Sequence, residues 1–207
     1  MITCELVSYH LHSIRIDIAI LSMHKLAAVC LLLASVAPAS AQSEKVGNDT
    51  SPNGKYAISV TTADEEHYEL KISNAATGEI ASVFPMEDYD TETQHHAVDA
   101  VWRPDSTAFA LNVERGRSIT VCEIYLEAQG KWQKLAIPDS DLEKLRKKAN
   151  EEGGPSRDYL NATGWKGKDT VELEYTGNKG TTYEIVCKMI AGNVPHLKVI
   201  SSKLKPD

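Results

Sequence analysis

What this sequence most plainly lacks is a catalytic signature. No Gly-x-Ser-x-Gly nucleophile elbow and no His-Glu-x-x-His zinc helix occurs anywhere in its 207 residues. Only two cysteines lie beyond residue 41, so that part of the chain has no paired-cysteine metal motif. These absences favour a non-catalytic protein that needs no cofactor, although a missing motif does not by itself exclude an enzyme.

Positive charge is also scarce. The chain has 22 Lys and Arg against 29 Asp and Glu, which gives a formal net charge of -7. Nucleic acids and anionic membranes are bound through basic surfaces, so this balance argues against both as partners. Beyond residue 42 no apolar run approaches the roughly 20 residues that a spanning helix needs, so we expect no membrane span there.

Residues 23–41 have the pattern of a cleaved export signal. A short basic start at 23–25 precedes an apolar run at 26–36 that is long enough for a signal h-region but too short to span a bilayer. The small residues of Ala39-Ser40-Ala41 form a cleavage site, which makes Gln42 the expected first mature residue. We therefore expect 42–207 to be a single domain that is periplasmic or secreted.

Short segments with strand periodicity recur along this domain. Apolar residues alternate with polar ones between turn residues, which predicts strands at 56–61, 68–72, 80–84, 108–113, 119–126, 132–137, 171–175, 183–190 and 195–201. A mostly charged segment at 139–152, stopped by Gly153-Gly154-Pro155, predicts one short helix between them. The predicted fold class is all-β with one inserted helix.

Three parts of the domain resemble one another. Residues 101–111 read as an aromatic anchor, a Pro-Asp-Ser turn and a strand, and 51–58 and 165–173 follow a similar order. Repeats of this kind every 50 to 60 residues or so are typical of propellers or of related meanders of small sheets. We expect either about three propeller-like antiparallel units or one twisted antiparallel sheet.

Two of these turns carry a resemblance to a known family. Ser51-Pro52-Asn53-Gly54 and Trp102-Arg103-Pro104-Asp105-Ser106 resemble the opening of the TolB-type β-propeller repeat, whose blades begin near an aromatic-Ser-Pro-Asp-Gly turn. The resemblance implies blade-like units, with Trp102 and Trp165 as packing anchors. Three units are fewer than the four or more of a closed propeller, so a partial propeller, a multimeric one and a twisted sheet with the same turn all stay open.

The segment 86–99 is the principal candidate site. Carboxylates suited to a hard cation are followed by two histidines that would favour zinc, at Asp88, Asp90, Glu92, His95 and His96. The alternatives are a partner-binding surface and a solvated acidic loop, since the glycine of a calcium loop is missing. We assign no metal and keep these five as candidate binding residues, with no catalytic residue named.

Trp132 and the two cysteines are the remaining candidates. Trp132 lies between Lys131 and Gln133, which makes it the tryptophan expected to be exposed and available to a glycan. Cys122 and Cys187 both fall on the apolar side of their predicted strands, where they would form either a disulfide or two buried thiols.

These observations favour an exported, non-catalytic binding or interaction module with an envelope protein or a glycan as its partner. One alternative is a metal-dependent or carboxylate/histidine hydrolytic enzyme that uses the 86–99 loop. A structural envelope protein is the other. Loops carry recognition surfaces on β-rich scaffolds, so the first interpretation also directs attention to 86–99.

Residues 1–22 fit the export signal poorly, because they place Glu5 and Asp17 ahead of a segment that is already complete. We predict that translation starts at Met23 and that 1–22 is a mis-assigned upstream start. N-terminal sequencing of the unprocessed precursor should then find Met23 as its first residue. A precursor that begins at Met1 would instead mean that the signal has a long n-region.

Overall fold

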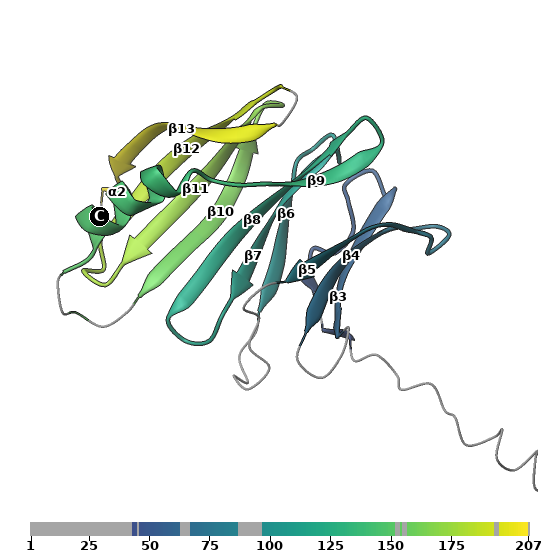
Figure 1. Ribbon diagram of the computed structural model, residues 1–207, viewed down its shortest axis with the longest axis horizontal. Coiled ribbons are helices and arrows are strands. Elements are labelled where there is room, and N and C mark those ends of the chain that lie inside the picture. Colours follow the sequence, from purple (N-terminus) through teal and green to yellow (C-terminus); the bar gives the residue numbers. More distant parts are fainter. Residues whose placement is uncertain are drawn as a thin grey trace, which may run out of the picture. The chain divides into compact units, whose positions relative to one another are not determined.

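The computed structural model describes residues 43–44, 46–62, 67–86, 97–151, 154, 157–192 and 195–206. Their strands form two sheets (Figure 1). The smaller sheet contains β1 (Ser43–Glu44), β3 (Tyr56–Thr62), β4 (Tyr68–Asn74) and β5 (Ile80–Met86). These strands lie in the order β1-β3-β4-β5 and every pair is antiparallel.

The larger sheet contains β2 (Val46–Gly47), β6 (Val98–Trp102), β7 (Ala108–Glu114), β8 (Ile119–Ala128), β9 (Lys131–Leu135), β10 (Asp158–Lys166), β11 (Thr170–Gly177), β12 (Thr182–Ile190) and β13 (His196–Leu204). Its order is β13-β12-β11-β10-β8-β7-β6-β2, and β9 pairs with β8 off this path. The pairs β2–β6 and β8–β10 are parallel. A parallel neighbour needs a long crossover connection, and helix α2 (Asp139–Ala149) lies in the connection between β9 and β10.

Strand β7 is buried on both of its faces. Phe109, Leu111 and Val113 belong to a first apolar cluster, whereas Ala110 on the opposite face belongs to a second. Side chains alternate across a strand, so large residues face one layer and a small one faces the other. This places β7 between two separate cores.

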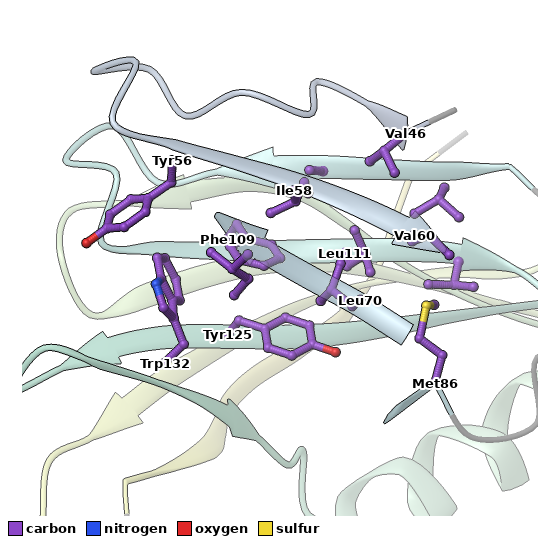
Figure 2. Packing of buried hydrophobic residues seen from close by; sticks show 14 residues of the cluster. Val46, Tyr56, Ile58, Val60, Leu70, Met86, Phe109, Leu111, Tyr125 and Trp132 are labelled. Carbon is purple, nitrogen blue, oxygen red and sulfur yellow. The ribbon is translucent and has the colours of Figure 1, made fainter. Parts of the chain in front are cut away.

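The first core joins the smaller sheet to β6–β9 (Figure 2). Ile58, Val60 and Leu70 come from the smaller sheet and Phe109 and Leu111 from β7. Aromatic rings close one part of it: Phe109 and Tyr125 stack with centroids 4.9 Å apart. Such pairs stabilise beyond their buried area when the rings are offset or tilted.

The second core joins β10–β13 to the other face of β7 and β8 and is covered by α2. Leu145 and Ala149 are the buried residues of the helix. The end of the helix lies close against the end of β11. A side chain at Gly177, the last residue of that strand, would lie 2.5 Å from the Ala149 carbonyl oxygen. Within the described ranges no helix is long and apolar enough to cross a bilayer.

The two turns that carry the family resemblance have the same hydrogen-bond geometry. The backbone N–H of Ser51 bonds to the Tyr56 carbonyl, as that of Arg103 does to Ala108, both at 2.9 Å. Gly54 and Ser106 occupy the same left-handed position, with φ of 69° and 63°. Their N–H groups donate to the carbonyls of Ser51 and Arg103 at 2.8 Å in both cases. The resemblance between 51–54 and 103–106 is therefore structural as well as sequential.

Arg103 and Ser106 connect these turns to each other and to the third repeat. The Ser106 hydroxyl accepts a hydrogen bond from the Asn53 N–H at 3.1 Å, which links the second turn to the first. The buried Arg103 guanidinium bonds to the Lys168 carbonyl oxygen and to the Thr107 hydroxyl, and it lies over the Trp165 ring. A buried charge of this kind is tolerated only when its donors are satisfied.

Most of the predicted elements are confirmed. All nine predicted strands coincide with strands to within a few residues, and the described part of the chain is mostly β with one short helix. The helix ends at Ala149 rather than at residue 152, and β1, β2, β6 and β10 have no counterpart among the predicted strands. The expectation of a purely antiparallel sheet is wrong, because the crossover that contains α2 makes the β8–β10 pair parallel. The division into propeller-like units stays a prediction, because neither sheet closes on itself and the β8–β10 pair joins the second and third repeats.

Asp105 makes the stability contributed by the 103–106 turn depend on pH. Its Oδ1 accepts hydrogen bonds from Arg103 Nε at 2.8 Å and from the Thr107 N–H at 3.1 Å. Burial acts to raise the pKa of Asp105, but these bonds outweigh it and hold the pKa below its usual value. The carboxylate therefore stabilises the fold fully above the unfolded pKa of about 3.9, and this contribution is lost as the pH falls through the lower folded pKa.

We predict that Asp105→Asn lowers the free energy of unfolding at neutral pH by about 1 kcal/mol, and that the difference from the wild type shrinks in acid. Asn53 already fills the equivalent position, where its Oδ1 accepts the Lys55 N–H at 2.9 Å, so the amide should keep the turn and remove only the charge. Urea melts at neutral and acidic pH measure both values. An equal loss at the two pH values would contradict the role of the charge.

Candidate functional site

The residues predicted in the 86–99 loop lie outside the described part of the chain. This applies to Asp88, Asp90, Glu92, His95 and His96. At the ends of the segment, Met86 is buried in the first core and Asp99 Oδ1 accepts a hydrogen bond from Asn48 Nδ2 at 3.0 Å. Among the described residues no group of three or more His, Cys, Asp and Glu is placed to hold a metal ion.

The expectation that Trp132 is exposed is wrong. Its side chain is only 6% exposed and packs edge-on against Tyr56, with centroids 5.1 Å apart (Figure 2). Lys131 and Gln133 point to the opposite face of β9, so their polarity says nothing about the face that Trp132 occupies. A ring enclosed in the first core offers no stacking platform to a glycan in solvent.

The other two tryptophans are tied to the backbone. The Trp102 indole N–H donates to the Asn48 carbonyl oxygen at 2.8 Å, and that of Trp165 donates to the Val101 carbonyl oxygen at 2.8 Å. Both are partly buried against a core cluster. Both indoles therefore have a packing role in the fold.

A cavity that the sequence did not indicate opens where two strands share one edge of β8. Strand β10 pairs with β8 at residues 119–120 and β9 pairs with the same edge at 124–128. Val121, Cys122 and Glu123 lie between these stretches, with no described strand beside them on that edge. The gap is a cavity of about 220 Å³ lined by Thr120, Val121, Cys122, Glu123, Lys134, Leu135, Ala136, Ile137, Leu142, Arg146, Asp158, Leu160 and Tyr175.

Asn112 explains why β10 leaves the β8 edge. Its carboxamide accepts the Ala162 N–H at 2.7 Å and donates to the Ala162 carbonyl oxygen at 3.0 Å, so a β7 side chain takes the role of a strand partner. The bond from Trp165 to Val101 then holds the end of β10 against β6. Because β10 turns toward β7 and β6, a space is left that α2 covers from one side with Leu142 and Arg146.

Two ion pairs stand among the lining residues. Lys134 Nζ lies 2.9 Å from Glu123 Oε1, and Arg146 Nε lies 2.9 Å from Asp158 Oδ2. Glu123 also accepts the Tyr125 hydroxyl at 2.6 Å, and Arg115 Nη2 is 3.7 Å away. The rest of the lining is largely apolar, so the cavity combines a hydrophobic wall with a small number of fixed polar groups. Ligand sites in proteins are commonly built this way.

The thiol and the two phenols beside the cavity, Cys122, Tyr125 and Tyr175, stay protonated at neutral pH. Burial raises the pKa of the Cys122 thiol. Burial and the neighbouring Glu123 carboxylate raise the pKa of Tyr125, and burial also raises that of Tyr175. A thiol held in its neutral form is a poor nucleophile, so the arrangement suits binding better than covalent catalysis.

One sequence feature marks this place. Glu123 interrupts an otherwise apolar strand, and a carboxylate is almost never buried unless it is paired. That observation identifies Glu123 but not Lys134 or Arg146, which come from other elements.

Comparison with known proteins adds no assignment: no protein-family model, curated protein or solved structure matches the chain.

Cys122 and Cys187 are both free thiols in the structure, and both pack in the second core. Burial raises the pKa of Cys187 to about 12 and raises that of Cys122 as well, so neither forms much thiolate at neutral pH. We predict that a thiol reagent labels neither residue in the folded exported protein and labels both after unfolding. Intact mass without reductant measures this. A protein that stays unlabelled when unfolded and labels only after reduction would carry the disulfide instead.

Proposed function

We propose that the chain is an exported, non-catalytic binding module that holds a small ligand in the cavity between β8, β9, β10 and α2. The observation that carries this proposal is the gap in the sheet at residues 121–123, which is lined by apolar side chains and bordered by two ion pairs. Sheets are normally continuous along a paired edge, so an opening kept by specific contacts on both sides favours a site over a packing defect.

The scaffold in this proposal consists of three propeller-like units. Matching hydrogen bonds in the 51–54 and 103–106 turns support a common repeat for the first two. In the third unit Trp165 resembles Trp102 in donating its indole N–H to a backbone carbonyl. Export follows from the expected signal at 23–41, and a glycan or an envelope protein remains the alternative partner through the 86–99 loop.

The proposal predicts that small amphipathic fragments bind in the cavity. NMR titration of the exported protein should shift the methyl signals of Leu135, Leu142 and Leu160, which line it. Ala136 is an exposed lining residue, so Ala136→Trp should place an indole across the opening and abolish these shifts. Ala76→Trp, in the exposed β4–β5 turn of the other sheet, is the matched control and should leave them unchanged.

Two results would contradict the proposal. In the first, no fragment of a size suited to the cavity moves the three leucine signals of the wild-type protein. In the second, binding survives Ala136→Trp with the same affinity, which would place the ligand elsewhere. Thermal melts of both tryptophan variants establish that each is folded before binding is compared.

A further inference from the structure

Resting on the proposed binding function, we infer that the ligand is a small carboxylate with an apolar body, held by Lys134 and Arg146 at its charged end and by the cavity wall along its body. The size of the cavity, the charges in its lining and the hydrogen-bond donors of those charges support this chemical class.

The wall and the volume set the body of the ligand. Val121, Leu135, Ile137, Leu142 and Leu160 supply the apolar surface, and the cavity measures about 220 Å³. An apolar cavity of about 150 Å³ already takes up benzene, so this one has room for about one substituted ring or a chain of six to eight carbons. Burying such a body stabilises the complex by roughly 25 cal/mol per Å² of apolar surface.

In both ion pairs the cation is more exposed than the anion. The Lys134 side chain is 40% exposed and its partner Glu123 only 8%. The Arg146 side chain is 43% exposed and its partner Asp158 27%. Each cation is therefore more accessible to a ligand from solvent than the carboxylate that it pairs with.

Both cations also have N–H donors beyond those used in the ion pairs. An ammonium has three N–H donors, and among the described residues Lys134 donates to one acceptor, Glu123. A guanidinium has five N–H donors, and within the same part of the chain Arg146 donates to two acceptors, Asp158 and Glu143. Glu123, by contrast, already receives bonds from Tyr125 and Lys134 and has Arg115 nearby. Donors that face solvent can bond an acceptor-only group such as a carboxylate, whereas a cationic ligand would have to displace Lys134 or Arg146 from its partner.

The charge of the whole chain makes this local arrangement more informative. A formal net charge of -7 repels anions at long range. A preference for a carboxylate must then come from the two cations that line the cavity and from direct hydrogen bonds. Charge-assisted bonds to a carboxylate are about twice as strong as neutral ones, which is sufficient for a preference of about tenfold.

The experiment compares three ligands that share one body. Octanoate, octanol and octylammonium are titrated into the exported protein, and the leucine methyl shifts give each dissociation constant. We expect octanoate to bind about tenfold more tightly than octanol, and octylammonium to bind most weakly. Added salt should weaken octanoate and leave octanol unchanged, because only the former interaction is between charges.

Matched variants assign the preference to its residues. Lys134→Gln and Arg146→Gln should each reduce the ratio of octanol to octanoate dissociation constants toward one. Lys131→Gln is the control, since Lys131 is an exposed lysine of the same strand that does not line the cavity, and it should keep the full ratio. Melts of all three variants separate a loss of recognition from a loss of fold.

The outcomes distinguish this inference from the function on which it rests. Octanol or octylammonium binding as tightly as octanoate, with the leucine signals shifting, would overturn the carboxylate class and leave the binding site in place. A preference for octanoate that persists in both glutamine variants would overturn the assignment to Lys134 and Arg146. No response to any of the three ligands would overturn both proposals.

Discussion

The fold depends on the burial of β7 on both of its faces. A strand enclosed in this way cannot alternate apolar and polar residues, and 108–111 reads Ala-Phe-Ala-Leu without interruption. Large residues fill the core shared with the smaller sheet, and the alanines let β10 and its neighbours approach the opposite face. The smaller sheet packs over one face of this strand and β10 over the other, so the loss of either core would expose one face of it to water.

Polar contacts then fix how the layers meet. Arg103 stands at the start of the β6–β7 turn and reaches both the β10–β11 loop and the Trp165 ring. Ser106, in a left-handed conformation that favours glycine, contributes the hydroxyl that glycine could not offer to Asn53. Apolar contacts are non-directional, whereas these hydrogen bonds are directional. They fix how the 51–54 turn, the 103–106 turn and the β10–β11 loop meet.

Features formed by interactions within one strand can be predicted from the sequence, and features formed by residues far apart in the chain cannot. Alternation predicted β3, β4, β8 and β12 because each strand carries its own pattern of large apolar residues. Strand β10 escaped prediction because its inward residues include Ala162 and because Trp165 reads equally well as the start of a repeat. The composition of 86–99 indicates a site there, and its candidate residues from Asp88 to His96 lie outside the described part of the chain. The predicted exposure of Trp132 is wrong because the residues that flank it on the strand belong to the other face.

The cavity is the clearest case of a feature that no local pattern encodes. It exists because two strands, separated by a helix, both pair with one edge of β8, and their pairing positions lie at 119–120 and 124–128. A two-residue parallel pairing followed by divergence is uncommon unless something replaces the lost ladder bonds. Asn112 does so for Ala162 on one side, and Glu123 is satisfied by Tyr125 and Lys134 on the other. Asn112 therefore diverts β10 and leaves the backbone groups of 121–123 facing a space rather than a strand. Of the two side chains only Glu123 also forms part of the cavity wall.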